Sequence, residues 1–268
     1  MDILTAVLVV GGLGLGCSIM LVLAAKFMAV PSDETALKVE EVLPKANCGA
    51  CGFAGCSDYA AAVARGDAPA NMCVPGGEEV AKKVAEIMGT DAGTIEKKIA
   101  VVICRGNDAA TSDKYIYRGI DSCAAANLLY SGQSGCSYGC LGLGDCVREC
   151  KFDAIFVENG LANADPALCT GCGACAAVCP KSVIKMVPLS KRSIVQCRSH
   201  NKGAVTHKLC TNGCIACGKC VKNCPQNAIT IVDNLAVIDL SLCTACGKCR
   251  EVCPVKACRS IATAGAEK

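Results

Sequence analysis

Three runs of the sequence place four cysteines at one short spacing, C-x2-C-x2-C-x3-C, each followed by proline. Cysteine thiolates at this spacing are ligands of four-iron, four-sulfur (4Fe-4S) clusters. The first three cysteines of a run wrap one cluster, and the fourth reaches the cluster that another run holds. The runs therefore predict redox cofactors with crossed ligands. They comprise Cys169, Cys172, Cys175 and Cys179, then Cys214, Cys217, Cys220 and Cys224, and finally Cys243, Cys246, Cys249 and Cys253.

The part of the chain that holds these runs is duplicated. Shifting the sequence by the number of residues from Cys150 to Cys224, here called the repeat offset, superposes Cys150 on Cys224. The same shift also superposes the run that begins at Cys169 on the run that begins at Cys243. In both halves a connector of the same length precedes the last run, and its apolar residues alternate around Asn-Gly or Asp-Asn. Alternation interrupted by such dipeptides predicts a β-hairpin. Each half is therefore expected to be a small two-cluster ferredoxin unit.

The leading run of the first half is irregular. It reads CSYGCLGLGDCVREC, and Lys151 stands where the regular runs have proline. Crossed ligation still provides four thiolates for each cluster. The expected sets are Cys136, Cys140, Cys146 and Cys179; Cys150, Cys169, Cys172 and Cys175; Cys214, Cys217, Cys220 and Cys253; and Cys224, Cys243, Cys246 and Cys249.

Another cysteine group precedes the duplicated part. NCGACGFAGC places Cys48, Cys51 and Cys56 at C-x2-C-x4-C, and Cys73 follows at a distance in NMCVPGG. The glycines between these cysteines let the backbone approach a cofactor closely. A fifth 4Fe-4S cluster is therefore expected here. A zinc ion is the alternative to the cluster, although two separated C-x2-C pairs are more usual for zinc.

Six cysteines remain outside these sets. VVICRG around Cys104 is similar to IVQCRS around Cys197, and a second cysteine follows each of them ahead of a ferredoxin unit. This repetition predicts a sixth cluster, for which the alternative is a group of buried free thiols. Cys17 and Cys258 are not expected to be ligands. The predicted sixth set is Cys104, Cys123, Cys197 and Cys210.

The composition agrees with metal ligation. The chain has 26 cysteines in 268 residues, 3% aromatic residues and no Trp, so large side chains are too scarce to form the interior alone. Chains this rich in cysteine are disulfide scaffolds or thiolate-metal proteins. The close spacing keeps most neighbouring cysteines from pairing in relaxed disulfide geometry. Iron bound by the same cysteines in a reducing compartment is therefore expected.

The beginning of the chain predicts one transmembrane helix. No charged residue occurs from Ile3 to Ala25, and about 23 residues at roughly 1.5 Å each span a hydrocarbon core of roughly 30 Å. A cleaved signal peptide, the alternative, needs a basic start and a small-residue cleavage site. Lysines follow the segment and Asp2 precedes it, which places the rest of the chain on the cytoplasmic side. Gly12 and Gly16 have the spacing that lets another membrane helix approach.

The predicted fold class is α+β. The expected domains are the transmembrane anchor (1–30), a small helical 4Fe-4S domain (31–98), and two tandem bacterial-type ferredoxin units (99–188 and 189–268). A helix capped by Ser32 or Asp33, a helix over 78–88 and a short strand over 99–103 are predicted within them.

Charge is distributed unevenly along the chain. Residues 181–268 hold fourteen Lys and Arg against four Asp and Glu, whereas residues 1–180 are net negative by seven. Such a basic part offsets the charge of anionic clusters, and it is also predicted to attract acidic redox proteins. The chain has no G-x-G-x-x-G that opens a βαβ unit, no P-loop and no C-x-x-C-H. NAD and haem are therefore not expected on this chain. With only His200 and His207 and no recognisable pair of carboxylates, catalytic bond chemistry is not expected either, and neither flavin nor nucleic acid is.

The order of these parts resembles the B subunit of the Rnf complex. The resemblance covers nearly the whole chain, and its most specific element is NCGACGFAGC followed by Cys73. KYIYRGIDSC and CSYGCLGLGDC resemble the longer form of this subunit that occurs in anaerobes.

The Rnf complex is the ion-translocating ferredoxin:NAD oxidoreductase of bacterial membranes. The resemblance implies an electron-transfer subunit that takes electrons from reduced ferredoxin and passes them to other membrane and peripheral subunits. The complex delivers them to NAD and exports sodium ions or protons. A single-pass protein of the inner membrane with its clusters on the cytoplasmic side is therefore expected. The alternatives are a soluble polyferredoxin that serves a hydrogenase or corrinoid system, and a zinc-stabilised interaction module.

Overall fold

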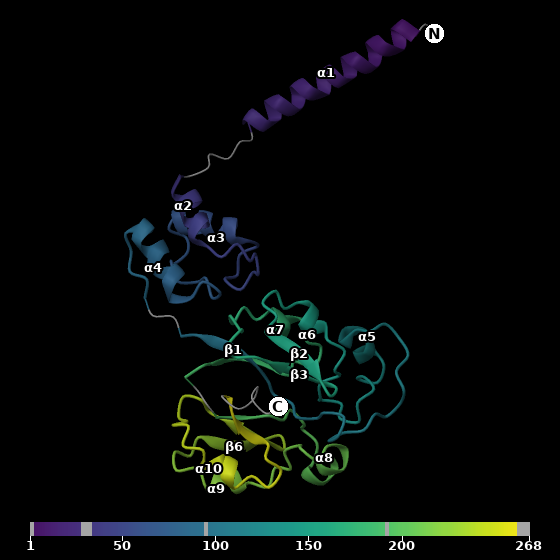
Figure 1. The fold of residues 1–268 in the computed structure, drawn as a ribbon, viewed down its shortest axis with the longest axis vertical. Helices are drawn as coiled ribbons and strands as arrows, with labels where there is room; N and C mark the ends of the chain where they lie inside the picture. The colour runs from purple at the N-terminus through teal and green to yellow at the C-terminus, as the bar shows by residue number, and fades with distance from the viewer. Residues whose placement is uncertain (1–2, 28–33, 94–95, 191–192, 262–268) are drawn as a thin grey trace.

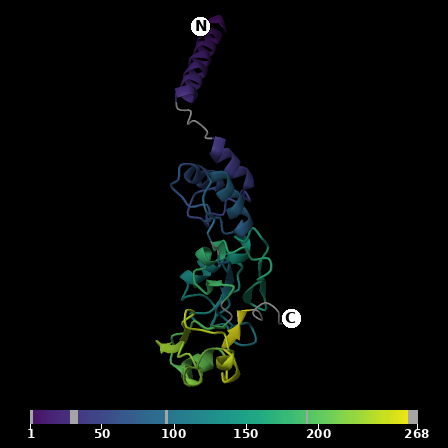
Figure 2. The ribbon, with the colours of Figure 1, turned by 90° about the vertical axis from the view of Figure 1, so that its left-hand side faces the viewer.

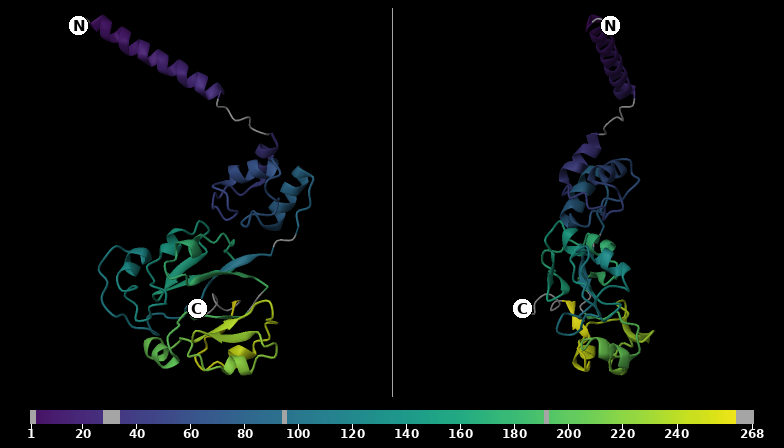
Figure 3. Two further views of the ribbon diagram at one scale, coloured as in Figure 1. Left: turned by 180° about the vertical axis from the view of Figure 1, so that it is seen from behind. Right: turned by 90° about the vertical axis from the view of Figure 1, so that its right-hand side faces the viewer.

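The computed structural model describes residues 3–27, 34–93, 96–190 and 193–261. The chain is elongated, with helix α1 (Ile3–Phe27) at one end and the second ferredoxin half at the other (Figure 1). Figures 2 and 3 show the same order from the side and from behind. The mixture of helices and small sheets confirms the predicted α+β class.

Helix α1 contacts no other element in these views, and its large side chains, such as Leu13 and Met20, are exposed. None of the helices within the described ranges combines the length and hydropathy that crossing a membrane requires. The transmembrane span predicted over 1–30 is therefore not confirmed. Residues 1–2 and 28–30 of that range, and the predicted cap at Ser32 or Asp33, lie outside the described residues.

Three helices form the domain that follows: α2 (Glu34–Val42), α3 (Cys56–Ala64) and α4 (Gly77–Met88). The predicted helix over 78–88 is confirmed as α4, which ends at Gly89 in the left-handed conformation (φ 64°) that favours glycine. Val39, Tyr59 and Val84 form the centre of the apolar core between the helices. This core holds the loops that carry the first cysteine group.

The described strands form four two-stranded antiparallel sheets. The two predicted hairpins are confirmed as β2 (Ile155–Glu158) with β3 (Leu161–Ala164), and β6 (Ile229–Val232) with β7 (Leu235–Ile238). Both turns have two successive residues with positive φ, Asn159 and Gly160 in one and Asp233 and Asn234 in the other. Two positive φ values are the requirement of the type I′ turn, which matches the twist of paired strands.

The other two sheets join distant parts of the sequence. Strand β1 (Lys98–Val102) pairs with β4 (Ile184–Pro188), and β5 (Ser193–Val195) pairs with β8 (Cys258–Ser260). Every residue of β1 after Lys98 is buried, and the strand is part of the core of the first half. Each long-range pair thus brings the two ends of one half together.

Six short helices lie within the described parts of the two halves. They are α5 (Cys123–Leu128), α6 (Asp145–Arg148), α7 (Ala174–Val178), α8 (Gly203–Leu209), α9 (Lys219–Lys222) and α10 (Lys248–Glu251). Each of them except α8 carries one cysteine. Helices α7 and α10 each follow a glycine with φ 81°, Gly173 or Gly247. Helices α6 and α9 follow Gly144 and Gly218, also with positive φ. The repeat offset relates the two glycines of each pair, so the duplication seen in the sequence is also a structural repeat.

Candidate iron-sulfur sites

The first cysteine group surrounds the start of α3. The Cys56 backbone N–H donates to Asn47 Oδ1 at 2.8 Å, which fixes the loop that carries the preceding cysteines. Burial raises the pKa of Cys73, and the nearby thiols of Cys56, Cys48 and Cys51 raise it further. The four sulfur atoms therefore lie close enough to interact electrostatically, although three of them are close in sequence and the fourth is distant.

Tyr59 connects α3 to the loop before Cys73. Its hydroxyl donates to the Pro69 carbonyl at 2.8 Å and accepts from the Met72 backbone N–H at 3.2 Å. Burial raises the pKa of Tyr59 to about 12, so the hydroxyl keeps its proton and remains a donor. This one buried side chain positions the segment that delivers the distant cysteine.

In the first ferredoxin half, one cavity is lined by four cysteines: Cys150, Cys169, Cys172 and Cys175. The Ala154 backbone N–H donates to Cys150 Sγ, and that of Ala100 on β1 donates to Cys169 Sγ, each at 3.3 Å. Burial raises the pKa of Cys175 to about 12. A thiol buried in this way needs amide donors or a cation to become a thiolate.

The second half repeats this cavity with Cys224, Cys243, Cys246 and Cys249. The Ala228 backbone N–H donates to Cys224 Sγ at 3.3 Å, and the repeat offset superposes this hydrogen bond on the one between Ala154 and Cys150. Cys246 is exposed, unlike Cys249. These two cavities contain the sets that crossed ligation expects.

Three of the four cysteines expected at the other site of the second half lie in one apolar cluster. Cys214 and Cys220 are buried and Cys253 packs against them, while Cys217 is exposed. The pKa of Cys253 is lowered to about 5, mainly because the buried Cys258 thiol forms a hydrogen bond with it. Cys258 thus contacts this site, which the sequence did not predict.

The irregular part of the first half is arranged differently from the expected set. One cavity is lined by Cys123, Cys140, Cys146 and Cys179, and Cys136 does not line it. The repeat offset explains this arrangement. It superposes Cys140 on Cys214 and Cys146 on Cys220, but it places Leu143 where the second half has Cys217. Helix α5 supplies Cys123 to this site, and Leu143 packs against the same small core as Cys123.

Asp145 holds α5 in place. Its buried carboxylate accepts hydrogen bonds from the backbone N–H groups of Cys123 (3.0 Å) and Ala124 (2.9 Å) and from the Ser122 hydroxyl (3.0 Å), and it also pairs with Arg148. Burial by itself would raise the pKa of Asp145, but these hydrogen bonds and the Arg148 charge lower it. One carboxylate at the start of α6 therefore fixes the helix that brings Cys123.

Cys136 lies in another cavity, which also contains three members of the predicted sixth set. The four cysteines that line it are Cys104, Cys136, Cys197 and Cys210. Burial raises the pKa of Cys104 to about 12. Burial also raises the pKa values of Cys197 and Cys210, and the nearby Cys136 thiol adds to the increase at all three. The structure thus exchanges Cys123 and Cys136 between the two sets that the sequence predicted.

The sequence held a signal for the placement of Cys136 only. The repeat offset that relates the regular runs also superposes Cys136 on Cys210. The rule of crossed ligation instead predicted that Cys136, Cys140 and Cys146 of the irregular run bind the same cluster. The repeat position does not account for Cys123, because it superposes Cys123 on Cys197, and these two cysteines line different cavities.

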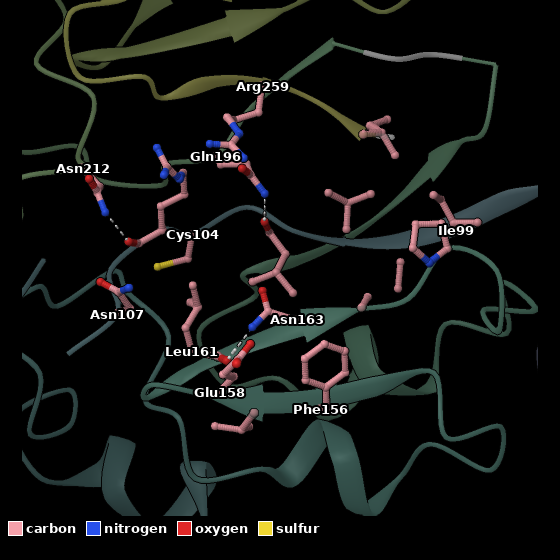
Figure 4. A pocket seen from close by; sticks show the side chains of 18 residues that line it. Ile99, Cys104, Asn107, Phe156, Glu158, Leu161, Asn163, Gln196, Asn212 and Arg259 are labelled. Carbon is pink, nitrogen blue, oxygen red and sulfur yellow. Dashed lines mark hydrogen bonds between the residues drawn. The ribbon is translucent and has the colours of Figure 1, made fainter. Parts of the chain in front are cut away.

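A larger cavity, of about 430 Å³, adjoins this four-cysteine cavity (Figure 4). Both cavities are lined by Cys104, Arg105, Gln196 and Asn212. Gln196 donates to the Val102 carbonyl at 3.1 Å and Asn212 to the Arg105 carbonyl at 3.0 Å. Among the described residues, no three His, Cys, Asp or Glu side chains are placed to hold a single metal ion.

Family models match three segments of the chain. An Fe-S cluster family matches residues 43–75, which contain the first cysteine group. Two families of 4Fe-4S dicluster domains match residues 168–229 and 213–257. The first cysteine group and the three regular runs thus lie in segments that are similar to known iron-sulfur domains, whereas Cys104, Cys123, Cys136, Cys140, Cys146 and Cys150 lie outside them.

Curated relatives extend over most of the chain. It is 44% identical over 238 residues to the B subunit of the Na(+)-translocating ferredoxin:NAD(+) oxidoreductase complex of Acetobacterium woodii, which covers 88% of this chain and 72% of that protein. It is 42% identical to the B subunit of the ion-translocating oxidoreductase complex of Methanosarcina acetivorans, over 88% of this chain and 90% of that protein. The corresponding protein of the proton-translocating complex of Clostridium ljungdahlii is 45% identical over 76% of this chain and 72% of that protein. The chain therefore belongs to the family of B subunits of the Rnf ion-translocating oxidoreductase complexes, as an electron-transfer subunit.

Proposed function

We propose that this chain carries electrons from reduced ferredoxin toward NAD within a membrane complex that exports sodium ions or protons. The observation that carries the proposal is the series of cavities lined by four cysteines, in a chain similar to subunits of ferredoxin:NAD oxidoreductases. Bound 4Fe-4S clusters would supply one-electron carriers. The chain itself binds them, spaces them and presents them to partners.

Four ligand sets follow from the sequence motifs together with the contacts described above. Their thiols face one cavity, pack together or interact electrostatically, except that the exposed Cys217 is assigned by its position in the motif. Several sulfurs accept backbone N–H bonds, as cluster ligands do. Thiols and amide donors are the donor set that an iron-sulfur cluster requires, so the residues fit the cofactor. The proposed sets are Cys48, Cys51, Cys56 and Cys73; Cys150, Cys169, Cys172 and Cys175; Cys214, Cys217, Cys220 and Cys253; and Cys224, Cys243, Cys246 and Cys249.

The proposed domain division follows the sheets. Pairing of β1 with β4 supports a first ferredoxin unit over 99–188, and pairing of β5 with β8 supports a second over 189–268. The core of α2, α3 and α4 supports a separate cluster domain over 31–98.

The second half is the proposed receiving end. Helices α9 and α10 expose Lys219, Lys222, Lys248 and Arg250. Each helix begins close to an exposed cysteine, Cys217 or Cys246. A positive surface beside accessible cluster ligands would attract an acidic ferredoxin and bring the two redox groups close.

The first half contacts the N-terminal cluster domain through Lys151. Its Nζ donates to the Ala46 carbonyl at 2.9 Å and lies 3.4 Å from the Asn47 carbonyl, just before Cys48. A Cβ added at Gly171 would lie 3.2 Å from Val74 Cγ1, so the residues after Cys73 also approach this half. Lys151 directly follows Cys150, and the proposed electron exit therefore runs from the Cys150 site to the Cys48 site.

Replacing Lys151 with methionine is expected to weaken this contact by about 1 kcal/mol, or roughly fivefold in population, because an exposed hydrogen bond is lost. Iron content should not change, while electrons should reach the N-terminal cluster about fivefold more slowly. Rapid-freeze EPR after mixing with reduced ferredoxin measures this rate. Lys185→Met on β4, also exposed, is the matched control. An unchanged rate in Lys151→Met would contradict the proposed exit.

Helix α1 is the proposed membrane anchor. Most of its exposed side chains are apolar, as Leu13, Leu15 and Leu21 illustrate, and such a surface is expensive to leave in water. Fractionation of cells that express the full-length chain tests this proposal. Detergent should be needed to release the protein, and release by a salt wash would favour a soluble polyferredoxin instead.

The function is tested by mixing the anaerobically purified full-length chain with reduced ferredoxin. Broad absorption near roughly 400 nm, as expected of iron-sulfide charge transfer, should bleach as electrons arrive. A colourless protein that binds zinc would contradict the proposal.

A further inference from the structure

The cavity of Cys104, Cys136, Cys197 and Cys210 lies between the two ferredoxin halves. Two of its cysteines precede the first hairpin, and the other two precede the second. The segments that carry them are tied together, because the Thr111 hydroxyl donates to the Leu209 carbonyl at 2.8 Å and the Thr211 backbone N–H donates to the Ala110 carbonyl at 3.0 Å. The cavity is therefore part of the contact between the halves.

One pair of its cysteines is equivalent in the repeat. The repeat offset superposes Cys136 on Cys210 and Gly139 on Gly213. The Gly139 N–H donates to the Cys136 carbonyl at 3.1 Å, and the Gly213 N–H donates to the Cys210 carbonyl at 3.2 Å. A Cβ at either glycine would meet the carbonyl of its partner cysteine, at 3.4 and 3.3 Å. The same tight turn thus presents a thiol from each half.

The other pair is held in a matching way. Cys104 and Cys197 follow strands β1 and β5, and each accepts a backbone hydrogen bond at 3.4 Å from the residue two positions later, Gly106 or Ser199. Each of the two sulfurs also accepts a hydrogen bond from the backbone N–H of a cysteine in its own half. The repeat offset superposes these two donor residues, Cys140 and Cys214. The Cys140 N–H donates to Cys104 Sγ at 3.4 Å, and the Cys214 N–H donates to Cys197. The four thiols thus form two matched pairs with matched amide donors.

The neighbouring site does not require Cys136. Cys123, Cys140, Cys146 and Cys179 already line that cavity, and Leu143 occupies the position of Cys217. Assigning Cys123 there and Cys136 to the junction gives each cavity four thiols. The alternative assignment would require both cysteines to leave the cavities that they line.

We propose that Cys104, Cys136, Cys197 and Cys210 bind a 4Fe-4S cluster that joins the two ferredoxin halves, and that Cys123 completes the separate site of Cys140, Cys146 and Cys179. This inference rests on the proposed function, since both require the chain to assemble iron-sulfur clusters. With two ligands from each half, the junction cluster fixes the halves to each other and provides a carrier between their cluster pairs.

Iron and acid-labile sulfide in the full-length wild-type chain, purified anaerobically, give the first test. Six clusters correspond to about 24 Fe per chain, and five to about 20. A wild-type value near 20 would overturn the junction cluster whatever the variants do. A chain with no cluster at all would instead overturn the proposed function.

Double substitutions test which cysteines share a cluster. Cys136→Ser with Cys197→Ser should lose about 4 Fe, because both residues serve one cluster, whereas Cys123→Ser with Cys197→Ser should lose about 8. The opposite pattern would assign Cys123 to the junction and overturn the exchange. Cys17→Ser on α1 is the control and should keep the wild-type iron content. If Cys136→Ser with Cys197→Ser retains no iron, the variant Cys104→Ser with Cys210→Ser is measured in its place, because these two residues belong to the same proposed cluster. The wild-type iron content still decides whether that cluster exists.

Discussion

Replacing Lys219, Lys222, Lys248 and Arg250 with glutamate is expected to slow electron transfer from reduced ferredoxin by about 100-fold at low ionic strength. The four side chains are exposed on α9 and α10, beside the exposed Cys217 and Cys246. Reversing their charge turns attraction of an acidic protein into repulsion. Stopped-flow measurement of the second-order rate constant tests this, with iron content measured in parallel.

The matched control reverses four lysines far from α9 and α10. Lys38, Lys45, Lys82 and Lys83 are exposed on or near α2 and α4, and their replacement by glutamate changes the net charge by the same amount. This control should react at nearly the wild-type rate. Added salt should slow the wild type and speed the α9 and α10 variant, because screening removes both attraction and repulsion. Equal effects of the two variants would indicate that total charge, not this surface, governs the encounter.

Replacing Asp145 with alanine is expected to remove the cluster bound by Cys123, Cys140, Cys146 and Cys179. The buried carboxylate accepts from Cys123, Ala124 and Ser122, and its loss leaves these donors without their acceptor. Such a loss costs about 3 kcal/mol in local stability. Helix α5 should then no longer hold Cys123 at the site, and the full-length chain should contain about 4 Fe less than the wild type.

Iron content and the temperature at which absorption near roughly 400 nm is lost provide the measurements. Asp145→Asn keeps one acceptor oxygen and should give an intermediate result. Glu149→Ala, an exposed acidic position four residues later, is the matched control and should behave as the wild type. Full iron content in Asp145→Ala would show that α5 is not held by this carboxylate.

The architecture of the cysteine-rich part could be predicted largely from the sequence. The two hairpins, helix α4 and the position of β1 all follow from short-range patterns, since Asn-Gly and Asp-Asn supply the positive φ values that a tight turn requires. The crossed sets that contain Cys150 and Cys224 rest on the same kind of rule, in which a fixed short spacing sends the last thiol to a second cluster.

Contacts between distant segments could not be predicted in this way. Lys151 is a departure from the regular motif in the sequence, and only its bond to the Ala46 carbonyl gives it a role. The sequence does not indicate that Cys258 contacts a cluster site, but its buried thiol donates a hydrogen bond to Cys253. No spacing rule describes either contact, because each depends on how separate segments pack.

The sequence by itself determined the type of ligand, the number of thiols and the duplication, because these are properties of residue identity and local spacing. The tertiary structure decided which thiols of the irregular segment meet. Cys123 reaches its cavity because Asp145 holds α5, and Cys136 lines another cavity together with Cys104, Cys197 and Cys210. Such choices depend on long-range packing and buried hydrogen bonds, whose partners lie far apart in the sequence.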